Sequence, residues 1–317
     1  MNLDQLAQDL APLNLRSALI SHAGLLVFEH YRDQSAATEL YRINSCTKSI
    51  LSALICIAMD QGLLPPLTVK AADYFPQLRQ DADSRKQDIT LEHLLTMSAG
   101  FNWSEFGGIN SFPKMTRTGN WIDYVLQQRL REAPGTRMEY NSGVSQLLAS
   151  ILVQVSGVSA ARFAELHLFG PLGIQEYLWQ TDPQGIHTGG FGLSLRPADL
   201  LAFGGLYLRK GLAQDGRRLI SAELAARSTA AAIGTEPPRR GRYGWHWWSD
   251  SYTADQATAG AASLEYYYAR GYGGQFVYIV PQHETVVVLT SDQRMPRKQA
   301  PPDVFRSCIA PRLLSCP

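Results

Sequence analysis

A hydroxyl group and a primary amine stand three residues apart in Ser45-Cys46-Thr47-Lys48, directly before an apolar run from Ile50 to Met59. If this run is helical, Ser45 and Lys48 lie on one face, about one turn apart. A serine hydroxyl is a weak nucleophile until a base takes its proton, and a neutral lysine amine can be that base. The spacing therefore favours a serine acyl-transfer site that needs no histidine.

The tetrapeptide alone leaves a structural alternative open, in which Ser45 caps the helix and Lys48 is a solvated first-turn residue. A second match, Ser111-Phe112-Pro113-Lys114, contains a proline that disfavours a helical residue before it, and the surrounding glycines predict a loop. We therefore interpret the second match as coincidence. The first match has the better context, because Asn44 is a plausible N-cap and the apolar run follows at once.

Composition limits the possible functions. The chain has 317 residues, 45% of them hydrophobic and 18% charged, which is typical of a globular protein with a large core. A formal net charge of +1 gives no electrostatic reason to expect nucleic acid or an anionic membrane as a partner. The four cysteines lack metal-ligand spacing, and the first residues lack the pattern of a signal peptide. We expect a soluble cytoplasmic protein with reduced thiols and no bound metal.

The pattern of apolar residues predicts one sheet that is built from both ends of the chain, with helices inserted between them. Strands are expected at residues 17–22, 25–31, 243–248, 264–269, 275–280 and 285–290. Helices are expected at residues 1–15, 45–61, 90–95, 121–130, 142–156, 160–169, 197–209 and 302–314. We expect an α/β sheet domain from residues 1–75 and 186–317, a helical domain from residues 76–185, and an active-site cleft between them.

A second candidate group is the tyrosine of Tyr140-Asn141-Ser142, at the start of an apolar helix. A tyrosine at a helix start can reach into a cleft, and its phenol could carry a proton if a nearby cation favoured the phenolate. The alternative is a core tyrosine whose hydroxyl has one satisfied hydrogen bond.

The third candidate is Gly271-Tyr272-Gly273-Gly274-Gln275, which leads directly into an apolar strand. Glycines weaken a strand, so their presence at its mouth needs a reason. Close approach of a ligand to the backbone is one reason, and the N–H of Gln275 could then donate to a developing oxyanion. A β-bulge or a tight packing point is the alternative.

Taken in order, the three stretches resemble the three motifs of the serine β-lactamase and penicillin-binding-protein superfamily. They are most similar to the class C-like branch with family VIII esterases and 6-aminohexanoate-dimer hydrolases. The resemblance covers about residues 17–291 and includes Ile89–Gly100 and the Gly189–Leu193 turn. It implies an α/β, β-lactamase-like fold, with an antiparallel sheet flanked by helices in three layers and an inserted all-helical lobe.

The resemblance also implies roles for individual residues. Ser45 would be the acylated nucleophile, Lys48 would share a proton with it, and Tyr140 would be the general base of acylation and pass the proton to the leaving group. The backbone N–H groups of Ser45 and Gln275 would form the oxyanion hole. Neither a metal nor an organic cofactor is implied. The implied or expected substrate-binding residues are Ser142, Tyr272, Gly273 and Gly274, with Trp103 and Phe106 as pocket walls.

Two departures from the family pattern bear on the substrate. Ser142 stands where many relatives have asparagine, and Tyr272 stands where β-lactamases have a lysine that contacts the substrate carboxylate. The second change favours neutral substrates over penicillin-like acids. We therefore expect a serine hydrolase that cleaves small carboxylic esters or amides through an acyl-enzyme. A β-lactamase or D-alanyl carboxypeptidase and a non-catalytic binding module are the alternatives, and the oligomeric state is open.

Overall fold

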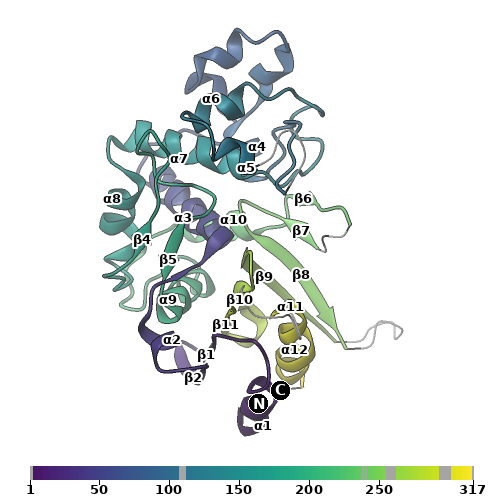
Figure 1. Cartoon of the computed structure of the whole chain (residues 1–317). Coiled ribbons are helices and arrows are strands. Elements are labelled where there is room, and N and C mark those ends of the chain that lie inside the picture. The colour runs from purple at the N-terminus through teal and green to yellow at the C-terminus, as the bar shows by residue number, and fades with distance from the viewer. Residues whose placement is uncertain are drawn as a thin grey trace.

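The computed structural model of the chain describes residues 3–106, 112–237, 239, 241–254, 262–292 and 301–315. Eight antiparallel strands form the main sheet, in the order β2-β1-β11-β10-β9-β8-β7-β6 (Figure 1). They are β1 (Ser17–His22), β2 (Leu25–Tyr31), β6 (Ile233–Gly234), β7 (Arg242–Tyr243), β8 (Trp248–Thr253), β9 (Ser263–Gly271), β10 (Gln275–Val280) and β11 (Thr285–Thr290). Because β1 pairs with β11, the sheet joins the two ends of the chain, as the pattern predicted.

Strands β10 and β11 are buried along their whole length because helices cover both faces of the sheet. On one face, α9 (Pro197–Leu208) comes so close that a Cβ atom on Gly204 would lie 2.5 Å from Val286. Neighbouring strand residues point to opposite faces. On the other face, the ring of Tyr278 therefore stacks on Phe305, with centroids 3.9 Å apart. Phe305 belongs to the C-terminal helix, our name for the consecutive helical elements α11, η7 and α12 (residues 301–314). The predicted arrangement of helix, sheet and helix is confirmed.

Most other helices lie between β2 and β6 in the sequence, and a short second sheet has the order β3-β5-β4. The remaining elements are α1 (Leu3–Leu10), α2 (Ser35–Thr38), β3 (Tyr41–Arg42), η1 (Asn44–Cys46), α3 (Thr47–Asp60), η2 (Ala71–Asp73), η3 (Pro76–Arg79), η4 (Ser84–Asp88), α4 (Leu91–Leu95), α5 (Phe112–Met115), α6 (Trp121–Leu126), α7 (Ser142–Ser156), α8 (Ala160–Ala164), η5 (Glu165–Phe169), β4 (Leu178–Trp179), β5 (Leu193–Leu195), α10 (Ala222–Thr229), η6 (Pro281–His283), α11 (Pro301–Val304), η7 (Phe305–Ile309) and α12 (Ala310–Leu314).

Helices α3 and α7 pack against each other and begin at the first and second motifs. Both helices end as the sequence predicts, at a glycine in the left-handed conformation: Gly62 and Gly157 each have a φ of 70°.

No single helix in the described residues is long and apolar enough to cross a membrane. Helix α7 and the helical segment Ala160–Phe169 reach the necessary length and apolar character only when they are counted as one helix, but the two are bent by 72° relative to each other.

Several local predictions are wrong: the helices expected at residues 1–15 and 121–130 end at Leu10 and Leu126, and two further errors have a common cause. Asn44 does not cap α3 with its side chain, because it lies in a left-handed conformation (φ 50°) and donates to the carbonyl oxygen of Tyr272 at 2.7 Å. Residues 243–248 do not form one strand, because the chain turns between β7 and β8. His246 has a φ of 60° there, and its N–H donates to the carbonyl of Leu95 at 3.0 Å. In both places a tertiary hydrogen bond overrides the local pattern.

The second Ser-x-x-Lys match also differs from its expected surroundings. Phe112–Met115 forms the short helix α5 rather than loop, while Ser111 lies outside the described residues.

Candidate active site

The amine of Lys48 is the centre of the site. Lys48 lies in the first turn of α3, and Ser45 lies just before it in the 3₁₀ turn η1. The Nζ atom of Lys48 is 3.2 Å from Ser45 Oγ, 2.9 Å from Ser142 Oγ and 2.7 Å from the carbonyl oxygen of Gly190. The first two motifs and the 189–193 turn therefore meet at one nitrogen atom.

Burial changes the acidity of this amine. Lys48 is 1% exposed, and loss of hydration lowers its pKa from 10.5 to about 8, although the nearby charge of Glu105 acts in the opposite direction. A lysine with this pKa is partly neutral near pH 8. The amine can therefore accept a proton from Ser45.

Tyr140 completes the group. Its ring centroid lies 4.8 Å from Lys48 Nζ, and its ring stacks on Trp248 with centroids 5.8 Å apart. Burial and then the charge of Glu105 raise the pKa of Tyr140, while a hydrogen bond with Ser45 lowers it less. The phenol is therefore held in its neutral form, which suits a proton donor better than a phenolate base.

The glycine-rich third stretch lies beside the first motif. A Cβ atom on Gly271 would be 2.2 Å from the carbonyl oxygen of Ile43, so this close approach requires glycine. The thiol of Cys46 donates to the carbonyl of Gln275 at 3.4 Å. With the bond from Asn44 to Tyr272, these contacts bring the third motif next to Ser45.

The side chain of Gln275 points away from the cleft, so only its backbone N–H remains for the expected role of oxyanion donor. Gln275 is 0% exposed, pairs with Gly271 and lies on β10, between β9 and β11. Its side chain donates inward to the carbonyl of Ser291 at 2.8 Å. Tyr272, just after the end of β9, is 56% exposed, and its ring contacts that of Phe106.

The predicted pocket aromatics do line a cavity of about 550 Å³ beside these groups. Trp103 is buried in its wall, whereas Phe106 is exposed and its ring lies 5.9 Å from the ring of Tyr272. Residues 107–111, which follow Phe106, lie outside the described part of the chain. The cavity is lined by Asn102, Trp103, Ser104, Glu105, Phe106, Arg131, Glu139 and Arg239.

The sequence reasoning missed several residues of the site, above all Glu105. This buried carboxylate accepts hydrogen bonds from the Ser142 N–H and the Trp103 indole, each at 2.9 Å, and from the Ser142 hydroxyl. Gly190 was noted only as part of a turn. A single acidic residue in a loop belongs to no periodic sequence pattern. Only its position two residues after Trp103, a predicted pocket residue, pointed to the site.

Two missed arginines bring positive charge near the phenol. The guanidinium carbon of Arg239 lies 5.9 Å from the centroid of the Tyr140 ring, and Arg239 forms a 3.9 Å ion pair with Glu139. The charge of Arg270 lowers the pKa of Tyr140, against the larger effect of burial. The site therefore has cationic side chains even though position 272 is a tyrosine rather than a lysine.

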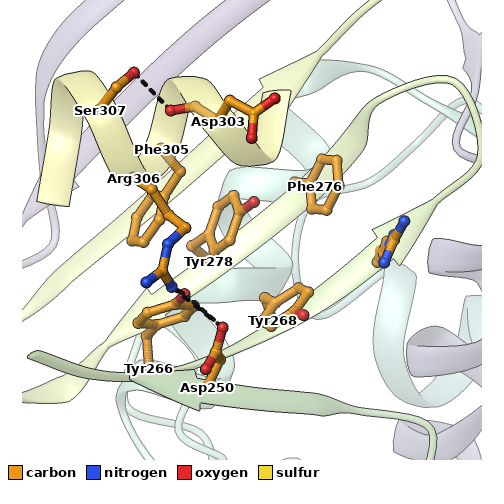
Figure 2. A pocket seen from close by; sticks show the side chains of 10 residues that line it. Asp250, Tyr266, Tyr268, Phe276, Tyr278, Asp303, Phe305, Arg306 and Ser307 are labelled. Atoms are coloured by element: carbon orange, nitrogen blue, oxygen red, sulfur yellow. Dashed lines mark hydrogen bonds and ion pairs between the residues drawn. The ribbon is translucent and has the colours of Figure 1, made fainter. Parts of the chain in front are cut away.

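A row of stacked aromatic rings connects Tyr140 to the C-terminal helix. The row runs from Tyr140 through Trp248 to Tyr268 and on to Tyr278, with successive centroids 5.8, 6.4 and 5.3 Å apart. It ends on the C-terminal helix at a second cavity, of about 450 Å³ (Figure 2). There, Arg306 bridges the helix to the sheet through Asp250, at 3.3 Å.

Comparisons with known proteins identify the family of this chain. A model of the Beta-lactamase family matches residues 16–305. The D-alanyl-D-alanine-carboxypeptidase/endopeptidase AmpH of Escherichia coli K12 is 29% identical over 149 residues, which are 45% of this chain and 37% of that protein. The chain thus matches little more than a third of this curated relative's length.

Solved structures share the fold at low identity. A 6-aminohexanoate-dimer hydrolase from Bacillus anthracis has a TM-score of 0.79 at 20% identity, over 96% of this chain and 80% of that one. The hydrolase EstCE1, described as having promiscuous acyltransferase activity, scores 0.73 at 16% identity, over 97% of both chains. A class C β-lactamase from Rhodobacter sphaeroides scores 0.67 at 17% identity, over 98% and 97%. The family match, which spans most of the sequence, shows that this chain belongs to the Beta-lactamase family.

Proposed function

We propose that this protein is a serine hydrolase that cleaves small carboxylic esters or amides through an acyl-enzyme on Ser45. The observation that carries the proposal is the 3.2 Å contact between Lys48 Nζ and Ser45 Oγ, made by an amine whose pKa is lowered to about 8. A buried amine of this kind is a base in contact with a nucleophile. The related structures described as a 6-aminohexanoate-dimer hydrolase and as a hydrolase with promiscuous acyltransferase activity support acyl transfer.

In acylation, neutral Lys48 takes the proton of Ser45 while Ser45 Oγ bonds to the substrate carbonyl carbon. The carbonyl π electrons move to its oxygen, which the backbone N–H groups of Ser45 and Gln275 stabilise in this proposal. The tetrahedral intermediate then expels the leaving group. Tyr140 gives that group its proton and is reprotonated by Lys48.

Deacylation repeats these steps with water. Lys48 accepts a proton from the water molecule as its oxygen bonds to the acyl carbon. The second tetrahedral intermediate expels Ser45 Oγ, which regains a proton and leaves a carboxylic acid as product. The proposal thus moves the role of base from Tyr140 to Lys48, since burial holds the phenol neutral.

A second candidate is hydrolysis of acid-bearing substrates such as β-lactams. Arg239 and Arg270 supply positive charge near Tyr140 even though position 272 is a tyrosine. A substrate carboxylate could bind to either guanidinium group. We rank this candidate second, because Arg239 already pairs with Glu139.

A panel of p-nitrophenyl esters, linear amides and nitrocefin, run on wild type and Ser45→Ala, tests the proposal. We expect turnover of esters or amides that is lost in Ser45→Ala. Nitrocefin turnover well above that of the esters would favour the second candidate. If the folded protein turned over none of the panel and a fluorophosphonate failed to label Ser45, a non-catalytic binding role would be favoured instead.

A further inference from the structure

The hydrogen bonds around Glu105 fix the direction of the Ser142 hydroxyl. One carboxylate oxygen of Glu105 accepts from the Ser142 N–H and the Trp103 indole N–H, both at 2.9 Å. The other accepts from Ser142 Oγ. A carboxylate only accepts hydrogen bonds, so the single hydroxyl hydrogen of Ser142 is committed to Glu105. Ser142 Oγ can then only accept from Lys48.

The same counting applies to Lys48. Its Nζ atom contacts three oxygens, those of Ser45, Ser142 and Gly190. An ammonium group has three hydrogens and satisfies all three, but the neutral amine has two hydrogens and one lone pair. The Gly190 carbonyl and the Ser142 hydroxyl can only accept, so they take the two hydrogens. The lone pair is left to face Ser45.

We propose that Glu105 is a positioning residue that aims the lone pair of neutral Lys48 at Ser45, acting through the hydroxyl of Ser142. The inference rests on the proposed function, since it concerns the base of that reaction. Glu105 does not contact the nucleophile; it sets the donor and acceptor pattern around the base. When each atom of a buried hydrogen-bond network can act only as a donor or only as an acceptor, the hydrogens can occupy only one set of positions.

Glu105→Gln should reverse this pattern with little change in shape. The glutamine carbonyl must face the two N–H donors of Ser142 and Trp103, because its NH₂ group there would oppose them. The NH₂ group then faces Ser142 Oγ and donates to it. The Ser142 hydroxyl turns its hydrogen toward Lys48 and captures the lone pair that Ser45 needs.

The direction of this effect separates it from simple electrostatics. The negative charge of Glu105 raises the pKa of Lys48, so removing the charge alone would leave more of the amine neutral. A charge effect would therefore increase activity below pH 8. Lone-pair capture decreases activity at every pH, including the alkaline plateau where Lys48 is neutral.

The test is a double-mutant cycle on a p-nitrophenyl ester: wild type, Glu105→Gln, Ser142→Ala and the double variant, each from pH 5 to 10. A general base contributes roughly 10²–10⁴-fold to rate, so we expect Glu105→Gln to reduce plateau kcat at least about tenfold with little change in KM. In the Ser142→Ala background no hydroxyl can turn toward Lys48. The same Glu105→Gln change should then cost less than about threefold.

An equal loss in both backgrounds, or a gain below pH 8 without loss at the plateau, would overturn the inference. Glu105→Asp against Glu105→Asn provides a second matched pair should the glutamine variant not fold. The aspartate variant should be at least about tenfold more active, and equal activities would refute the proposal. Ser45→Ala is the reference. If it is inactive while Glu105→Gln matches wild type, only this inference fails, and if it is active the proposed function itself fails.

Discussion

The carbonyl oxygen of Gly190 lies 2.7 Å from the Nζ atom of Lys48. A Cβ atom on Gly190 would be 3.1 Å from that nitrogen and equally close to Ser142 Oγ, which is tighter than an ordinary contact. A side chain at residue 190 would therefore require the amine of Lys48 or the hydroxyl of Ser142 to shift by a few tenths of an ångström.

Gly190→Ala should push the amine away from Ser45, because the added methyl group takes space beside Lys48 and Ser142. We expect ester hydrolysis to fall about tenfold to a hundredfold, since catalytic geometry tolerates displacements of well under 1 Å. The measurement is kcat and KM together with the melting temperature. Gly234→Ala is the matched control, because a Cβ atom at Gly234 meets nothing within 4 Å. Unchanged activity in Gly190→Ala would show that the amine does not depend on this contact.

The rate of acylation should rise with pH through the pKa of Lys48. Burial lowers that pKa to about 8, and only the neutral amine is a base, so activity should drop about tenfold per pH unit below 8. The measurement is kcat/KM for a p-nitrophenyl ester between pH 5 and 10, in buffers of constant ionic strength. A flat profile from pH 5 to 8 would rule out neutral Lys48 as the base.

Tyr140→Phe should separate amides from activated esters. An amide nitrogen must gain a proton as it leaves, whereas p-nitrophenolate leaves without one. Loss of the phenol should therefore reduce amide hydrolysis roughly 10²–10⁴-fold and p-nitrophenyl ester hydrolysis less than about tenfold. The phenylalanine ring keeps the stacking on Trp248, so the melting temperature should change little. Equal losses for both substrates would contradict the role of Tyr140 as proton donor.

His246 should make the fold sensitive to acid. The ring bonds to the Leu95 carbonyl at 2.8 Å and to Ser145 Oγ at 2.9 Å, and burial lowers its pKa from 6.5 to about 3. Below pH 6.5 the unfolded chain binds a proton that the folded chain does not, so stability falls as the pH drops toward 3. The full loss would be about 4–5 kcal/mol.

The variant His246→Asn tests this dependence, because asparagine tolerates the positive φ at this position. We expect it to be less stable than wild type at pH 7, but with a smaller decrease in unfolding free energy between pH 6.5 and 4. Urea titrations at each pH measure the difference. Parallel curves for the two proteins would show that His246 is not the titrating group.

The sequence was sufficient for the parts of the site that depend on local spacing. Ser45 lies in the 3₁₀ turn η1 and Lys48 in the first turn of α3, so their three-residue spacing was enough to predict their contact. Glu105 could not be predicted in the same way, because its effect depends on a loop that meets the start of α7, and that contact leaves no periodic pattern in the sequence. The pKa of Tyr140 is raised chiefly by burial, and the burial of a side chain cannot be predicted from a short motif.

The fold shows the same division between local and tertiary signals. The apolar run from Val286 to Leu289 predicts a central strand that is buried on both faces, and β11 is buried along its whole length. The break between β7 and β8 could not be predicted, because it depends on the hydrogen bond from His246 to Leu95, about 150 residues away in the chain. Asn44 was misassigned as a cap for the same reason, since its partner is Tyr272.

The most direct test of the account is the site of covalent labelling by a fluorophosphonate, read by peptide mass spectrometry on folded wild type and Ser45→Ala. We predict a single phosphonylated residue, Ser45, with labelling that quickens as the pH rises through about 8 and is abolished in the variant. Labelling at another residue in wild type, or undiminished labelling of Ser45→Ala, would contradict the assignment of Ser45 as the nucleophile.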